Sequence, residues 1–204
     1  MLNVETRLPS LLPFSFYSRS TLDVLRDLIG MVLVMKSEEG LTSGVIVEAE
    51  AYRGEDDPAS FAFRGRTKRS EMLYGPPGRA FVYLTYGIHY LLNVVTERED
   101  YPAAVLIRAV EPEEGIPLMK KRRKTDKLTN LCSGPGKVCQ AFGIDRSQNG
   151  ISMISSSSLL IINEGSKEKR QNRELVWSQR IGIREGKERL WRVYLKGSPF
   201  ISVK

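Results

Sequence analysis

Two glutamates, Glu48 and Glu50, interrupt an otherwise apolar stretch, GVIVEAEA, at residues 44–51. If this stretch is a strand, both carboxylates and Ile46 point to one face, with successive side chains about 6.6 Å apart. A glutamate is rarely buried without a partner or a catalytic task. The spacing therefore indicates a functional pair of carboxylates, although a solvated edge strand with ordinary glutamates would show the same pattern.

Arg108 interrupts a second apolar run, AAVLIRAV, at residues 103–110. A guanidinium stays charged and forms bidentate pairs, so an arginine in such a run usually forms an ion pair with a buried carboxylate. The candidates for that partner are Glu48, Glu50 and the nearby Glu111.

The segment RAFVYLTYGIHYLLNVV, residues 79–95, predicts two strands joined by a tight turn near Tyr86 and Gly87. Aromatic side chains on both sides of such a turn, in a basic chain, suggest a hairpin that meets nucleic-acid bases. The loop before it carries cations that suit phosphate contacts: Arg64, Arg66, Lys68 and Arg69. Solvated loop charges and a tyrosine packed at an ordinary hairpin tip are the alternatives.

The composition is that of a globular chain with a basic balance. The 204 residues fit one large domain, and a net charge of +7 favours polyanionic partners. A solvated basic surface would give the same charge, so the balance alone does not specify a function.

Several classes of site and location are disfavoured by the sequence. Cys132 and Cys139 lack the spacing of zinc ligands, and His89 is the one histidine in the sequence that could join them as a ligand. We therefore expect buried, reduced thiols and no metal. No window approaches about 18 uninterrupted apolar residues, so no membrane span is expected. The N-terminal segment has Glu5 and nearby prolines where a signal peptide would have a basic start and an uninterrupted apolar run. We therefore expect a cytoplasmic protein, associated with the nucleoid if bacterial.

Apolar spacing predicts a helix from Thr21 to Ile29, with Ser20 and Asp23 as a capping box and Gly30 as its end. A second helix is predicted to begin at residues 111–113. It ends in the basic run KKRRK (residues 120–124), which serves either solubility or DNA affinity.

A third helix is predicted to run from Ser133, its cap, to Phe142, with Gly143 as its stop. Its first residues, GPGK, end in Lys137 but lack the spacing of a phosphate-binding P-loop. Backbone amides at such a helix start could still hold a DNA phosphate. Short strands are expected at residues 31–35, 151–154, 159–162, 191–195 and 200–203.

Six segments of the chain, taken together and in order, resemble the alkyladenine (3-methyladenine) DNA glycosylase family: VEAEAY, RGRTKR, GPPGRAFVYLTYGIHYLLNVV, VLIRAVEP, LCSGPGKVCQA and RIGI…GSPFISV. The resemblance runs from about Ser20 to the end. It implies a mixed α/β (α+β) fold in a single domain, residues 1–204. That domain would have a curved antiparallel sheet, flanking helices and a β-hairpin that protrudes into the DNA minor groove.

The resemblance also implies a reaction. The partner would be double-stranded DNA with a damaged base, which these enzymes flip into a pocket. Tyr86 would fill the gap in the duplex, and Gly87 would give the turn its backbone freedom. Glu50 would act as general base on a water that attacks the sugar C1′, and Arg108 would help to position that water. Glu48 is given a structural role.

Further residues match the family's pocket. Tyr52 and Tyr83 would stack on the flipped base, and Asn93 would discourage normal guanine; their alternative roles are core packing and a buried amide satisfied by backbone. Family members commonly carry histidine where this chain has Phe61, which cannot hydrogen-bond. We therefore expect a preference for cationic 3- or 7-alkylpurines over neutral lesions.

DNA contacts are assigned to Tyr86, Arg64, Arg66, Arg69 and Lys137. We expect a monomeric, monofunctional hydrolase that uses no cofactor and leaves an abasic site. Two alternative functions remain. One is a non-catalytic damaged-DNA-binding protein on the same fold. The other is an RNA-modifying transferase, which the absence of a nucleotide-cofactor motif from the sequence disfavours.

Overall fold

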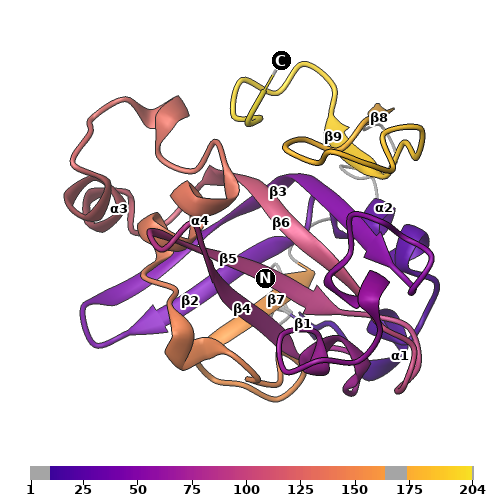
Figure 1. Cartoon of the computed structure of the whole chain (residues 1–204). Helices are drawn as coiled ribbons and strands as arrows, with labels where there is room; N and C mark the ends of the chain where they lie inside the picture. The colour runs from indigo at the N-terminus through magenta and orange to yellow at the C-terminus, as the bar shows by residue number, and fades with distance from the viewer. Residues whose placement is uncertain (1–9, 164–173, 204) are drawn as a thin grey trace, which may run out of the picture.

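The computed structural model of the chain describes residues 10–163 and 174–203 (Figure 1). Residues 1–9, on which the expectation about a signal peptide rests, lie outside this range. The strands are β1 (Ser10–Leu11), β2 (Val32–Ser37), β3 (Gly40–Arg53), β4 (Ala80–Thr85), β5 (His89–Val95), β6 (Ala103–Pro112), β7 (Leu159–Asn163), β8 (Leu175–Ser178) and β9 (Arg192–Leu195). The helices are α1 (Phe14–Tyr17), α2 (Thr21–Leu28), α3 (Ile116–Arg123) and α4 (Pro135–Phe142).

Within these residues the nine strands form one antiparallel sheet, in the order β1-β7-β2-β3-β6-β5-β4, and β9 joins β3 to β8. Figure 1 shows α3 and α4 towards the left of the view and α1 and α2 towards the right, and residues of α2 and α4 pack in the same core. The mixed α/β class that the sequence predicts is confirmed. The long strand β3 is central, because β2, β6 and β9 all pair with it.

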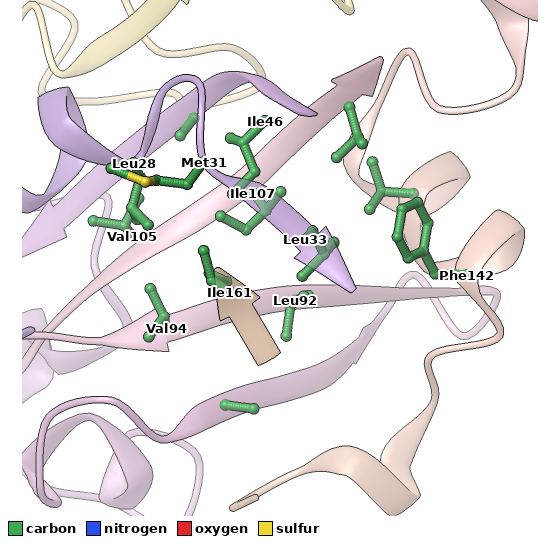
Figure 2. Packing of buried hydrophobic residues seen from close by; sticks show 14 of the residues in the cluster. Leu28, Met31, Leu33, Ile46, Leu92, Val94, Val105, Ile107, Phe142 and Ile161 are labelled. Atoms are coloured by element: carbon green, nitrogen blue, oxygen red, sulfur yellow. The ribbon is translucent and has the colours of Figure 1, made fainter. Parts of the chain in front are cut away.

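The main core lies where α2 and α4 pack on the sheet. Figure 2 shows side chains from β2, β3, β5, β6 and β7 meeting Leu28 of α2 and Phe142 of α4. Cys132 and Cys139 are free and buried in this cluster, as predicted, and burial raises the pKa of each thiol to about 12. Among the described residues, no helix combines the length and the apolar character that a membrane crossing requires.

One prediction about β3 is wrong. The pairing of β3 with β6 shifts register on both sides of Glu48, so the strict alternation of side chains breaks there. Ile46 consequently packs in the main core with Ala49 and Ala51, not beside Glu48 and Glu50. Val47 packs against Ala109 and Phe200 on another surface of the sheet. The two glutamates do share one face, because both contact Arg108.

The start of α2 is capped differently from the sequence prediction. Ser20 is the N-cap residue but makes no side-chain cap hydrogen bond, so the capping box with Asp23 is wrong. Glu97, which follows β5, takes its place: its Oε1 accepts from the Thr21 backbone N–H (2.7 Å) and from the Thr21 hydroxyl (2.8 Å). A carboxylate at a helix N-terminus is favourable, and this one ties α2 to the sheet.

The other helices begin later than predicted. The strand β6 continues to Pro112, where it pairs with Gly44, so α3 begins only at Ile116. Gly134, not Ser133, is the N-cap residue of α4, because the Ser133 hydroxyl is used by the Lys137 ammonium (3.2 Å). Gly143 does end α4, in the left-handed conformation that favours glycine.

The strand predictions are right for the sheet and wrong for two loop segments. Strands β2, β7 and β9 appear within two residues of the predicted bounds. Residues 151–154 and 200–203 are not strands, and β8 was missed. The segment between β3 and β4 is a loop that contains two 3₁₀ turns, Phe61–Arg64 and Glu71–Tyr74.

The observed cap makes a prediction about stability. Glu97→Ala removes both hydrogen bonds to Thr21 and should lower the free energy of unfolding by about 1–2 kcal/mol. Asp23→Ala is the matched control; because Asp23 is half-exposed, it should change the free energy by less than about 0.5 kcal/mol. Urea denaturation measures both. A larger loss for Asp23→Ala than for Glu97→Ala would contradict the observed cap.

Candidate active site

The hairpin of β4 and β5 ends in an exposed aromatic residue. Residues 86–88 form the turn between Thr85 and His89, with left-handed φ angles at Tyr86 (51°) and Gly87 (71°). The predicted position of the turn is therefore confirmed. The Tyr86 side chain is 89% exposed and Ile88 beside it is 71% exposed. Tyr86 thus has no packing role at the tip, which argues against the alternative of an ordinary packed tyrosine.

A cavity of about 720 Å³ lies next to the hairpin. This volume is within the range of roughly 300–1,000 Å³ that is usual for small-ligand pockets. Its lining brings together predicted residues from five separate segments, namely β3, the loop after it, the β4–β5 hairpin, β6 and α4: Tyr52, Phe61, Arg69, Tyr83, Tyr86, Asn93, Arg108 and Lys137. Further lining comes from the loop Ile181–Ile183 and from the start of α4, which sequence reasoning did not assign to the pocket.

Aromatic rings form one wall of the cavity. Phe61 meets Tyr83 edge-to-face with ring centroids 4.8 Å apart, and Phe81 lies 5.2 Å from Tyr83. The guanidinium of Arg69 lies over the outer part of this cluster, 4.1 Å from the centroid of Phe61. Burial raises the pKa of Tyr83 to about 12, so its hydroxyl stays protonated at neutral pH. This wall offers faces and edges of rings, with few polar groups.

Asn93 is an amide satisfied by backbone, as one prediction had it, and it also stands in the cavity wall, as the other requires. Its side chain is buried and its Nδ2 donates to the Phe81 carbonyl oxygen (3.1 Å). It also lines the cavity. The backbone bond fixes the amide, so the group that faces the cavity is held in one orientation.

Glu50 is fully buried beside the cavity. Its Oε2 accepts from the Tyr52 hydroxyl (2.9 Å) and from Arg108 (3.1 Å), and its Oε1 accepts from the backbone N–H of Ile181 (2.7 Å). All three donor residues line the cavity. Burial raises the pKa of Glu50, and Arg108, the Ile181 N–H and Tyr52 oppose that rise in this order.

Arg108 forms ion pairs with both glutamates of β3, Glu48 and Glu50, and not with Glu111. Its Nε lies 3.1 Å from Glu48 Oε1, and one terminal nitrogen lies 3.1 Å from Glu50 Oε2. The guanidinium is buried, with its side chain only 7% exposed. The expectation of a buried carboxylate partner is confirmed, and the register of β3 on β6 explains it, since Ala49 pairs with Ile107 and Glu48 with Ala109.

The ring of Tyr52 packs against a second buried ion pair, which the sequence analysis did not predict. The Arg180 guanidinium lies 4.8 Å from the Tyr52 ring centroid and binds both oxygens of Asp57, at 2.6 and 2.8 Å. Both side chains of this pair are fully buried. Arg180 and Asp57 sit in polar loop segments rather than apolar strands, so the pattern that singled out Arg108 was absent for them.

The cations predicted to contact DNA differ in whether they already form ion pairs within the protein. Arg64 and Arg69 are exposed, whereas Arg66 is bound by Glu71 (2.8 Å) and Asp100 (3.1 Å), and its guanidinium lies over Tyr74. Exposed ion pairs of this kind are weak, so Arg66 can exchange partners at some cost.

Lys137 stands in the first turn of α4 at the cavity wall, bonded to the side chains of Asn130 and Ser133. Its pKa is lowered by partial burial and then by two nearby cations: Arg123, from the basic run at residues 120–124, and Lys127, which the sequence did not single out. Like charges so close together favour an anionic ligand.

The close approach of α4 to the hairpin favours a glycine. A Cβ at Gly136 would stand 3.0 Å from the ring of His89, which also lines the cavity. His89 therefore packs against the start of α4 and closes one side of the cavity. Among the described residues, no group of three or more His, Cys, Asp or Glu side chains could hold a metal ion.

Comparison with known proteins connects this geometry to a family. The model of the family Methylpurine-DNA glycosylase (MPG) matches residues 15–199. A protein of Clostridium acetobutylicum is 45% identical, with 92% of this chain and 95% of its own covered. One of Methanoculleus marisnigri is 45% identical, with 94% and 98% covered. Both carry the name "Putative 3-methyladenine DNA glycosylase". The chain belongs to the methylpurine-DNA glycosylase family.

Proposed function

We propose that the protein excises alkylated purines, of the 3-methyladenine and 7-methylguanine type, from double-stranded DNA. It hydrolyses the N-glycosidic bond with a water activated by Glu50 and leaves an abasic site. The observation that carries this proposal is a buried carboxylate, paired with Arg108, directly behind an aromatic cavity. The whole chain acts as one domain and as a monomer.

The hairpin gives the base access to the cavity. A base inside a duplex must be flipped out at a cost of about a few kcal/mol, and an inserted ring offsets part of the lost stacking. Tyr86 suits this task because it stands in solvent next to the cavity mouth. Gly87 allows the turn its left-handed backbone at no steric cost.

The pocket selects a positively charged base. Tyr52 and Tyr83 line the cavity, and the electron-rich faces of such rings favour a cationic purine over a neutral one by roughly 0.5–2 kcal/mol. Asn93, fixed by its bond to the Phe81 carbonyl, would crowd the exocyclic amino group of normal guanine. An alkylated purine is therefore held and a normal guanine is disfavoured.

Glu50 has room for the attacking water. An ionised carboxylate accepts about four hydrogen bonds, and three donors already bind Glu50. The remaining position lies on Oε1, which has only the Ile181 N–H as partner. A water there would give a proton to Glu50 as it attacks C1′. A cationic base leaves without protonation, so a second carboxylic acid is dispensable, unlike in most glycoside hydrolases.

Lysine chemistry is not needed for this reaction. Lys137 lines the cavity, but its ammonium is bound to Asn130 and Ser133, and Glu50 is the group held against Arg108. We therefore assign simple hydrolysis, without strand cleavage. The DNA backbone is held by cations around the mouth: Arg64, Arg69, Lys137 and, less strongly, Arg66.

Glu50→Gln tests the proposal against a non-catalytic DNA-binding protein. The variant keeps the size of the side chain but cannot take a proton from water, so it should bind DNA containing 3-methyladenine and release no free base. Wild type should release 3-methyladenine and create alkali-labile sites. Wild-type protein that binds the lesion without releasing base would favour the binding-only alternative.

Phe61→His tests the selection of cationic bases. Histidine would add a hydrogen-bonding group to the aromatic wall, so single-turnover excision of neutral lesions such as hypoxanthine or ethenoadenine should rise by about 3- to 10-fold. Phe63→His is the matched control, because Phe63 is exposed and does not line the cavity. Equal activity of wild type and Phe61→His on neutral lesions would count against the proposed selection.

The assignment of backbone contacts predicts salt dependence. Each lost phosphate contact lowers the slope of log K against log salt by about 1, so Lys137→Gln and Arg69→Gln should each flatten it for undamaged duplex. Arg66→Gln should flatten it less, since Glu71 and Asp100 compete with phosphate. Arg26→Gln, on α2 between two aspartates, is the control and should leave the slope unchanged. Fluorescence anisotropy at several salt concentrations measures all four.

A further inference from the structure

The second glutamate of β3, Glu48, is fully buried like Glu50, but of its partners only Arg108 lines the cavity, so the proposed reaction leaves it without a role. Its Oε1 accepts from Arg108 Nε (3.1 Å), Arg192 Nε (2.7 Å) and the Ser202 hydroxyl (2.7 Å). Its Oε2 accepts from the Ser202 backbone N–H (2.5 Å). These four donors fill the capacity of about four bonds that a carboxylate has. Glu48 therefore has four protein donors and Glu50 has three, and the Glu48 donors from Arg192 and Ser202 belong to residues that do not line the cavity.

Glu48 also determines which way Arg108 points. The guanidinium offers its donors in a fixed planar fork, so a bond at Nε sets the direction of the terminal nitrogens. With Nε on Glu48, one terminal nitrogen reaches Glu50 and the other reaches the Ser202 hydroxyl at 3.3 Å. Without Glu48, nothing among these contacts would hold Nε.

The same carboxylate ties the C-terminal segment to the site. Ser202 gives Glu48 two of its four donors, and Arg192 of β9 joins Glu48 to the Val203 carbonyl oxygen (2.7 Å). Glu48, Glu50, Arg108 and Arg192 form a buried group of two negative and two positive charges. Ser202 and Val203 thus complete the hydrogen bonding of this charged group behind the catalytic carboxylate.

We propose that Glu48 is a positioning residue for the glycosylase reaction: it fixes Arg108 against Glu50 and couples the C-terminal residues Ser202 and Val203 to the catalytic carboxylate. This inference rests on the proposed function. It assigns the two neighbouring glutamates different tasks: Glu48 is held mainly by residues away from the cavity, and Glu50 by residues that line it.

The test is Glu48→Gln, with excision of 3-methyladenine followed in single turnover over a range of pH. The amide keeps one acceptor but turns a donor towards the Ser202 N–H, which loosens the fixed arrangement. A misplacement of about 1 Å can cost about 100-fold in rate, so the maximal rate should fall by about 10- to 100-fold. Affinity for lesion DNA should stay within about twofold, because Glu48 does not line the cavity.

The pH profile separates positioning from a merely structural role. Glu50 acts when ionised, so the rate rises with pH through its pKa, which burial raises above its ordinary value. The groups that act on Glu50 are Arg108 of β6, Tyr52 and Glu48 of β3, and Tyr83 of β4; Arg192 of β9, opposite Glu50, is bound to Glu48. Loss of the negative charge of Glu48 lowers the pKa of Glu50, so the acidic limb should move to lower pH.

Glu97→Gln is the matched control. It changes another carboxylate that accepts two hydrogen bonds, at the start of α2, and should lower the melting temperature without moving the acidic limb or the rate per folded molecule. Glu48→Gln that excises like wild type, or loses rate only in proportion to folded protein with an unmoved limb, overturns the inference. If wild type itself releases no base, the proposed function fails instead.

Ser202→Ala decides the matter if Glu48→Gln does not fold. It removes the hydroxyl that binds Glu48 and Arg108 but keeps the backbone N–H that binds Glu48. We expect the maximal rate to fall by about 3- to 10-fold at unchanged DNA affinity, as one hydrogen bond of the group is lost. A rate equal to wild type would overturn the coupling of the C-terminal segment to the site.

Discussion

The burial of two carboxylates and two guanidinium groups in one sheet is the constraint on which the rest of this structure depends. Removing an ion from water costs several kcal/mol, and attraction between ions repays it only when the geometry is good and the remaining hydrogen bonds are made. Glu48 and Glu50 meet this condition through partners on β6, β9 and the loop that contains Ile181. The order β9-β3-β6 is therefore as much an electrostatic requirement as a result of apolar packing.

The bulge in β3 shows how the backbone serves this requirement. A regular strand would turn Ile46 to the same face as the glutamates, and the apolar side chain would compete for the space of the ions. The register shift at Glu48 sends Ile46 to the main core and leaves the glutamate face to Arg108 and Arg192. Bulges commonly occur beside active sites, where they redirect a side chain.

Local patterns in the sequence predicted the parts of the site that obey local rules. Charged residues inside apolar strands indicated that Glu48 or Glu50 pairs with Arg108. Two strand-like runs on either side of Tyr86 and Gly87 predicted the turn at these residues. The missed features join distant segments: the Glu97 cap spans 76 positions, and the contact of Arg180 with Asp57 spans 123. No local pattern encodes such contacts. The bulge was missed because an extra residue in a strand leaves the apolar and polar letters unchanged.

Specificity and chemistry in the proposed reaction follow from one property of the pocket. Its aromatic wall, with Phe61 edge-on to Tyr83, offers no group that could protonate a leaving base, and Tyr83 holds its own proton because burial raises its pKa to about 12. Glu50 can accept a proton but is committed to the water. In the proposed reaction a base that already carries its positive charge needs no acid to leave, and the same charge is what the faces of the rings bind best. A pocket that favours the cation in binding would thus also favour the base that is easier to release.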